Sequence, residues 1–173
     1  MRTRTQLINH VRSVVKVTGA RLPQTSAAAF ITRATADIPA EMRVAVDPLV
    51  RIITDLNRQI REGDHTIGAL IRDVYPVAER LQQPSGVGPI TALAFVLLVD
   101  DPTRFVNSRD VGAYFGLVPR LDESSDSQPQ LRISKCGDAL GRRLLVTAAH
   151  YILGPFGPEC DLRRHGQRIA ERG

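Results

Sequence analysis

The sequence predicts a mostly α-helical protein with basic N-terminal helices, a long coiled-coil helix and a helical C-terminal domain. Hydrophobic residues make up 43% of the 173 residues, enough for one good core or for a small domain with an extended element. Aromatic residues make up only 5% and tryptophan is absent, so helices packed through Ala, Val, Leu and Ile are favoured over a β-sandwich. We expect the three parts at residues 1–38, 39–76 and 77–173.

The charge is distributed unevenly along the chain, whose net charge is +5. Residues 1–36 carry six basic residues and no acid, residues 37–101 have a net charge of −4, and residues 132–173 have a net charge of +4. Two basic ends around an acidic middle suggest a polyanionic partner such as nucleic acid, met at both ends. An ordinary solvated surface is the alternative.

The cysteine content and hydropathy indicate the compartment. No signal peptide and no apolar run of transmembrane length is recognisable, and the two cysteines do not suggest a disulfide framework. We therefore expect a cytoplasmic protein that does not enter a membrane.

The basic N-terminal part predicts short amphipathic helices. Residues 3–18 carry an apolar stripe at helical spacing, and Gly19 is suited to end this helix. The stripe consists of Leu7, Val11, Val14 and Val15. Further short helices are expected over residues 26–36 and 39–45.

Residues 42–74 carry the clearest periodic pattern. Apolar residues recur at alternating spacings of four and three, and nine of the ten positions are apolar, with Gly63 as the exception. The positions are Met42, Val46, Leu49, Ile53, Leu56, Ile60, Gly63, Ile67, Leu70 and Val74. A 3.5-residue repeat with polar flanks is typical of a coiled coil. The repeat could fold back on the first helix, but its length favours pairing with a second copy in a homo-oligomer.

Two prolines predict the limits of the long helix. Asp47 can cap it and Pro48 suits the first helical position, so the helix is expected to start or kink there. Pro76 is expected to end it.

A glycine-rich turn joins two helices in the C-terminal domain. A short helix is expected to end at Leu81, and an apolar helix covers residues 90–99. The pattern is that of a helix-hairpin-helix, in which the backbone N–H groups of Gly86, Val87 and Gly88 can bind a DNA phosphate without reading its sequence. Many other helix pairs also join through glycine.

Three further helices are expected, at residues 101–105, at 109–115, and from Asp138 until Gly154 ends the last one. The buried stripe of this last helix is predicted to consist of Leu140, Leu144, Leu145, Ala148 and Ile152. The remaining residues up to Gly173 carry four arginines and show no pattern of a further element.

Residues 116–137 predict an ordered polar loop. The run GLVPRLDESSDSQPQLRISKCG has neither a helical nor a strand period, and its two prolines and four serines favour turns. Because packed helices flank it, we expect the loop to be held in place, where binding and catalysis tend to occur. A flexible surface connection is the alternative.

Ser124 and Ser125 are the candidate catalytic residues of this loop. A serine can attack phosphorus when cations neutralise the phosphodiester and another group accepts its proton. The basic residues that could bind the DNA are Arg120, Arg132, Lys135, Arg142 and Arg143. The local sequence contains no histidine base, and serines that only form turns are the alternative reading.

No metal site is predicted. The possible ligands Cys136, His150, Cys160 and His165 do not have the spacing of a common zinc site. The acids are expected on helix surfaces and caps, which does not match a magnesium site.

Several segments in a fixed order together resemble the C-terminal part of a DEDD-type insertion-sequence transposase (the IS-one-ten/one-sixteen family). They are RTRTQLINHVRSVVKVTGARLP, the repeat at 42–74, GVGPITALAF, DPTRF, GAYFGLVPR and ISKCGDALGRRLLVTAAH, which span almost the whole chain. The resemblance implies DNA cleavage and strand exchange through a phosphoserine link, a dimer or tetramer, and guidance by a structured RNA. It also implies magnesium bound by four acids of a preceding RuvC-like domain.

Two departures from the family pattern bear on activity. The chain starts where the RuvC-like domain would have ended, so it is expected to bind no magnesium and to be inactive as an isolated chain. The family's Ser-Ser/Thr-Gly-Gly-Lys loop corresponds here to residues 123–127, ESSDS, in which Ser124 aligns best with the nucleophile. The carboxylate of Asp126 would repel a phosphodiester. The alternatives are a non-enzymatic dimeric DNA- or RNA-binding module and a structural coiled-coil protein.

Overall fold

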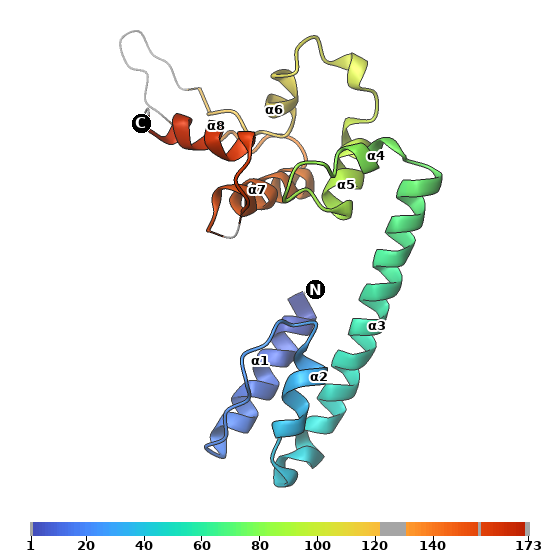
Figure 1. The fold of residues 1–173 in the computed structure, drawn as a ribbon, viewed down its shortest axis with the longest axis vertical. Coiled ribbons are helices and arrows are strands. Elements are labelled where there is room, and N and C mark those ends of the chain that lie inside the picture. The colour runs from blue at the N-terminus through green and yellow to red at the C-terminus, as the bar shows by residue number, and fades with distance from the viewer. Residues whose placement is uncertain (1, 122–130, 156, 172–173) are drawn as a thin grey trace. The chain divides into compact units, whose positions relative to one another are not determined.

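The structure is a computed structural model that describes residues 2–121, 131–155 and 157–171 (Figure 1). These residues form helices, turns and one isolated antiparallel bridge, which confirms the mostly α fold. The α-helices are α1 (Arg2–Val17), α2 (Phe30–Ala34), α3 (Arg43–Asp73), α4 (Val77–Arg80), α5 (Pro89–Val99), α6 (Asp110–Tyr114), α7 (Ala139–Leu153) and α8 (Asp161–Ala170). The 3₁₀-helices are η1 (Thr35–Asp37), η2 (Ala40–Met42) and η3 (Pro102–Arg104). No helix within the described ranges is both long enough and apolar enough to cross a membrane.

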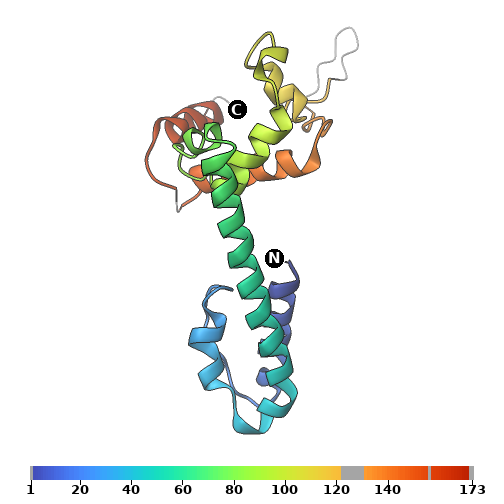
Figure 2. The ribbon, with the colours of Figure 1, turned by 90° about the vertical axis from the view of Figure 1, so that its right-hand side faces the viewer.

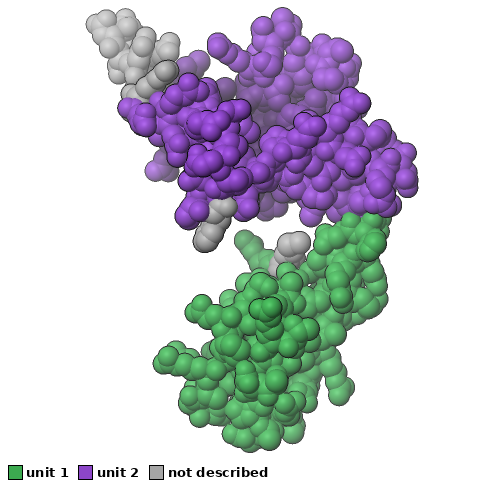
Figure 3. Space-filling model, in the orientation of Figure 1, with its two compact units in different colours: residues 1–66 green, residues 67–173 purple. Residues whose placement is uncertain are grey.

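The chain divides into two compact units, Met1–Thr66 and Ile67–Gly173 (Figure 3). The boundary between them falls within α3. The division into three parts at residues 1–38, 39–76 and 77–173 stays a prediction.

Unit 1 has a core formed by α1, α2 and the first half of α3, which lie side by side (Figures 1 and 2). The buried residues of this core are Ile8, Val11, Val15, Phe30, Ala34, Ile38, Val46 and Ile53. Arg12 also belongs to the framework, since its guanidinium lies 5.3 Å from the centre of the Phe30 ring and donates a hydrogen bond to the Leu22 carbonyl. At least one of the basic N-terminal residues therefore serves the fold.

The first half of the 42–74 repeat packs within its own chain. Val46 and Ile53 are completely buried in the unit 1 core, and Met42 and Leu49 pack against it. The expectation that the whole repeat pairs with a second copy is thus wrong for this half. The reason is that α1 and α2 offer an apolar surface that a short connection brings within reach at little entropic cost.

The long helix begins earlier than expected. α3 starts at Arg43 and continues through Pro48, so the expected start at Asp47 is wrong, and the alternative of a kink there stays a prediction. Pro48 cannot donate a hydrogen bond to the Val44 carbonyl, but Val44 is 89% exposed, so water can satisfy this carbonyl. At its other end the helix stops at Asp73, before Pro76, as expected.

Unit 2 is built on the apolar helix α5, which packs against α4 and α7. Ala92 and Leu93 of α5 are buried together with Ile71 and Ala78. The 3₁₀-helix η3 and the helix α6 follow near the places that the sequence predicts.

The stripe that α7 buries only partly matches the predicted one, because Leu144 and Leu145 are half-buried rather than buried. Leu140 is 48% exposed, whereas Gly141, Ala148 and Ile152 are buried. A Cβ atom on residue 141 would lie 2.6 Å from Cε1 of Phe115, so the face of α7 that packs against Phe115 begins at Gly141.

The helix α8 was not expected from the sequence. Its Arg163 donates from Nη1 to the carbonyl oxygens of Ile152 (3.1 Å), Gly154 (2.7 Å) and Gly157 (2.9 Å). Gly166 of α8 packs against the Leu153 side chain. An arginine and a glycine thus hold α8 against the end of α7, and neither produces an apolar period in the sequence.

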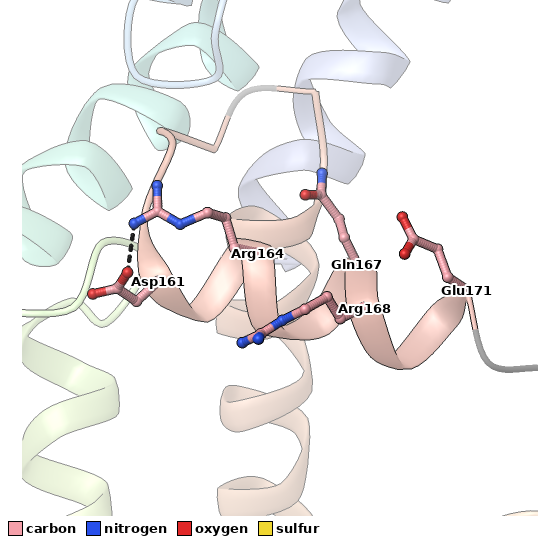
Figure 4. A pocket seen from close by; sticks show the side chains of 5 residues that line it. All are labelled: Asp161, Arg164, Gln167, Arg168 and Glu171. Carbon is pink, nitrogen blue, oxygen red and sulfur yellow. Dashed lines mark hydrogen bonds and ion pairs between the residues drawn. The ribbon is translucent and has the colours of Figure 1, made fainter.

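The exposed face of α8 carries a hollow of about 520 Å³ (Figure 4). It is lined by Asp161, Arg164, Gln167, Arg168 and Glu171, which include two acids and two arginines. Asp161 accepts a hydrogen bond from Arg164, and this bond raises the pKa of the arginine. None of the predicted site residues lines this hollow.

Candidate functional site

The predicted nucleophiles Ser124 and Ser125 lie in the segment 122–130, which is outside the described residues. The structure shows the two ends of the loop that carries them. These ends determine where the serine segment is attached.

The two ends pair as a short antiparallel stem, which we define as residues 116–120 and 132–135. The Arg120 N–H donates to the Arg132 carbonyl and the Ser134 N–H donates to the Val118 carbonyl, both at 2.9 Å. Pro119 and Ile133 form the bridge between these bonds, and the Lys135 N–H donates to the Gly116 carbonyl at 3.1 Å. Paired backbone keeps the two ends at the spacing of neighbouring strands. The attachment points of the serine loop are therefore fixed relative to each other.

Close backbone packing attaches the stem to the neighbouring helices. A side chain on Gly116 would collide with the backbone of Cys136, and one on Gly137 would collide with the carbonyl oxygen of Tyr114. Both glycines have a positive φ, 64° and 79°. Lys135 also has a positive φ, 58°, which costs a non-glycine residue about 1 kcal/mol.

The first turn of α7 adds two side-chain contacts at this point. Asp138 caps the helix as predicted, because its Oδ1 accepts a hydrogen bond from the Gly141 N–H at 2.6 Å. Arg142 donates from Nη1 to the carbonyl oxygens of Phe115 (3.1 Å) and Cys136 (2.9 Å). The guanidinium of Arg142 thus contacts the chain immediately before the stem and immediately after it.

The other candidate cations surround the stem to different degrees. Arg120 and Arg132 are exposed, and the backbone hydrogen bond places them opposite each other at the end of the stem from which the serine segment leaves. Lys135 is exposed at the other end, where the stem joins the helices. Arg143 is exposed on α7, on the helix turn next to the stem contacts of Arg142.

The glycine-rich turn has one face against the protein and one open face. Gly86 has a φ of 90°, and a Cβ atom there would lie 3.0 Å from the Ala148 carbonyl oxygen of α7. The Val87 N–H donates to the Pro84 carbonyl. Gly88 precedes α5 and has open space around it, and the first N–H groups of a helix have no partner within that helix. Of the three predicted residues, Gly88 is thus the most accessible to a phosphate.

The sequence analysis named Arg120, Arg132 and Lys135 as candidate cations but missed what fixes the stem. The tripeptide Cys136-Gly137-Asp138 carried a usable signal, since a glycine directly before an N-cap indicates a sharp turn into a helix. The contacts of Arg142 had no such signal, because nothing in the sequence indicates which carbonyl groups an arginine reaches.

Comparison with known proteins adds the family. Residues 78–160, which include the glycine-rich turn, the stem and α7, match the family described as "Transposase IS116/IS110/IS902 family". The chain is 30% identical over 159 residues to the transposase for insertion sequence element IS1111A of Coxiella burnetii, over 88% of the chain and 43% of the relative. It is 29% identical over 170 residues to a probable family 20 transposase of Pseudomonas aeruginosa, over 94% of the chain and 50% of the relative.

A third relative is the transposase for insertion sequence element IS1328 of Yersinia enterocolitica, 31% identical over 156 residues, 86% of the chain and 45% of the relative. The chain spans about half the length of the curated relatives it matches. The helical fold, the ordered motifs and these matches agree, and the chain is similar over most of its length to insertion-sequence transposases of the IS116/IS110/IS902 family.

Proposed function

We propose that the chain acts in DNA transposition as the DNA-binding and serine-bearing C-terminal part of such a transposase. The observation that supports the proposal is the stem, which pairs Arg120 with Arg132, two cations that flank the segment with Ser124 and Ser125 in the sequence. A phosphodiester bound by these cations would lie close to a hydroxyl group. The protein would be cytoplasmic, and associated with the nucleoid when bound to DNA.

In the proposed reaction a serine hydroxyl attacks the phosphorus of a DNA phosphodiester. An O–P bond to the serine forms, the bond from phosphorus to one deoxyribose oxygen breaks, and the proton lost by the serine balances the one that the departing oxygen gains. Attack by a hydroxyl of the second DNA on the phosphoserine then restores the serine and joins the strands. Arg120, Arg132, Lys135 and Arg143 neutralise the charge on the phosphate oxygens, and Gly88 before α5 binds a neighbouring phosphate.

The described residues do not fit a magnesium site. No group of three or more His, Cys, Asp or Glu side chains among them is arranged to hold a metal ion. The magnesium that the family resemblance implies would belong to the RuvC-like domain, where it would neutralise the phosphodiester.

The same resemblance supports assembly and RNA guidance as parts of the proposal. The second half of the 42–74 repeat has exposed apolar residues, with Leu70 at 40% and Val74 at 57%. Pairing of this half with a second copy would give a dimer or a tetramer. The basic residues at both ends of the chain would contact a structured RNA or DNA.

Salt titration tests the binding part of the proposal. We expect the affinity for duplex DNA to fall steeply as salt rises, and the slope of log K against log salt to weaken by about 2 in a variant with Arg120→Ala and Arg132→Ala, since each phosphate contact contributes about 0.9. Arg58→Ala is the matched control, because the exposed Arg58 is paired with Asp55 and Glu62 on α3. An affinity that does not change with salt would contradict phosphate binding.

Serine substitutions test the catalytic part. A full-length relative with its own nucleophile removed supplies the acidic domain, and strand exchange with this chain is then measured. We expect Ser124→Ala to abolish exchange and Ser125→Ala to preserve most of it, with DNA affinity unchanged in both. Exchange that survives in the variant carrying both substitutions would show that the nucleophile is assigned wrongly.

One feature favours a second candidate function, a non-enzymatic dimeric DNA- or RNA-binding module. Asp126 stands where the family has glycine, and its carboxylate would repel a phosphodiester beside Ser124. Such a module predicts salt-dependent binding without strand exchange, even when the acidic domain is supplied.

A further inference from the structure

Arg142 connects the two ends of the serine loop through a single nitrogen atom. Its Nη1 donates to the carbonyl oxygens of Phe115, immediately before the stem, and Cys136, immediately after it. These carbonyls are 21 residues apart in the sequence, with the serine loop between them. The side chain itself extends from the first turn of α7, which Asp138 caps.

The end of the chain before the stem is anchored firmly. Phe115 is completely buried, and its ring stacks on Phe95 of α5 with 5.6 Å between the ring centres. The neighbouring Tyr114 donates its hydroxyl to the Leu98 carbonyl at 3.0 Å. Phe115 also lies against Gly141 of α7. This end is therefore part of the unit 2 core.

The end after the stem is anchored much less. Lys135, Cys136 and Gly137 are all exposed, and two of them have a positive φ. Backbone bonds of the stem reach only as far as Lys135, whose N–H donates to Gly116. Besides the close backbone packing of Gly116 on Cys136 and of Gly137 on Tyr114, the side-chain bond from Arg142 to Cys136 ties this exposed end to the buried one.

We propose that Arg142 is a positioning residue, which orders the stem and thereby directs the serine loop without contacting the DNA phosphate itself. This inference rests on the proposed function for its effect on strand exchange. The hydrogen bonds at the stem do not depend on that function. Arg142→Lys distinguishes the effect of charge from that of side-chain length. Lysine keeps the positive charge, but its Nζ atom lies one bond closer to the backbone than Nη1 of arginine.

Hydrogen exchange of the stem amides tests the assignment in the complete chain. We expect the amides of Ser134 and Lys135 to exchange about tenfold faster or more in both Arg142→Ala and Arg142→Lys, because a charged hydrogen-bond donor is lost from a locally opening segment. Arg143→Ala is the matched control, since it removes a neighbouring exposed arginine of the same helix and should leave the hydrogen exchange of these amides unchanged. Unchanged hydrogen exchange in both Arg142 variants would overturn the proposal.

The rate of DNA strand exchange, measured with the acidic domain supplied in trans, is a second readout. A purely structural role of Arg142 would leave this rate unchanged. We expect Arg142→Lys to slow the exchange rate at saturating DNA about tenfold while the Kd for DNA and its salt slope stay unchanged. Added methylguanidinium should restore both rate and amide protection in Arg142→Ala. A weaker salt slope with an unchanged rate at saturating DNA would overturn the proposal, because it would show Arg142 to be a phosphate contact.

The two readouts distinguish failure of this inference from failure of the proposed function. If the unmodified chain performs no strand exchange, the proposed catalytic function fails. Faster exchange of the stem amides in the Arg142 variants would then still support the role of Arg142 in ordering the stem. Normal protection with normal strand exchange in these variants would refute the inference alone.

Discussion

At the scale of single residues, glycines and one arginine determine how the loop is attached. Gly116 and Gly137 allow backbone segments to approach where any side chain would collide, and Asp138 then starts α7. This explains in physical terms why the motif ISKCGDALGRR contains Gly137 directly before an acid. The residues that attach the loop are therefore different from the serines proposed to act in it.

Substitution of Gly137 tests this reading. We expect Gly137→Ala to destabilise unit 2 by about 2 kcal/mol or more, because the left-handed conformation is strained for alanine and its Cβ would collide with the Tyr114 carbonyl. Gly112→Ala is the control, since Gly112 lies in α6 with open space around it and alanine favours a helix by about 1 kcal/mol. Urea unfolding followed by circular dichroism measures both, and equal stability of the two variants would contradict the expectation.

At the scale of elements, apolar periodicity predicted the helices that are held by apolar stripes and missed the one that is not. α1 and α7 lie close to their expected positions because buried apolar residues recur along them, whereas α5 was expected from its continuous apolar run. In α8, Leu162 and Ile169 are 52% and 55% exposed, and the helix is held by Arg163 and Gly166. A pattern of apolar residues cannot reveal such a contact.

Arg163 provides the test at this scale. We expect Arg163→Ala to destabilise α8 by about 2 kcal/mol, because three carbonyl groups at the end of α7 lose a charged donor. Arg164→Ala is the matched control, since Arg164 is exposed and pairs with the exposed Asp161, a pair of little net stability. Hydrogen exchange of the α8 amides distinguishes the two, and comparable protection in both variants would show that Arg163 does not anchor the helix.

At the scale of the whole molecule, the sequence predicted the helical fold and the family, but not how the repeat at 42–74 is used. Its spacing is the same throughout, yet Val46 and Ile53 pack within unit 1 while Leu70 and Val74 stay exposed. A periodic pattern shows that a helix has an apolar face, but not whether that face meets the same chain or another one. Likewise, the sequence shows that basic residues lie near the loop, but it does not show that Arg120 and Arg132 lie opposite each other on the stem.

The stem has one more consequence, which concerns evolutionary change in this family. Because Gly116–Arg120 and Arg132–Lys135 are joined by their own backbone, the attachment does not depend on the identity of the intervening residues. Lengthening a loop between two fixed ends costs little free energy, about 0.6 kcal/mol for each doubling of the loop length. We therefore expect the helical body to tolerate changes of length or sequence between the two halves of the stem.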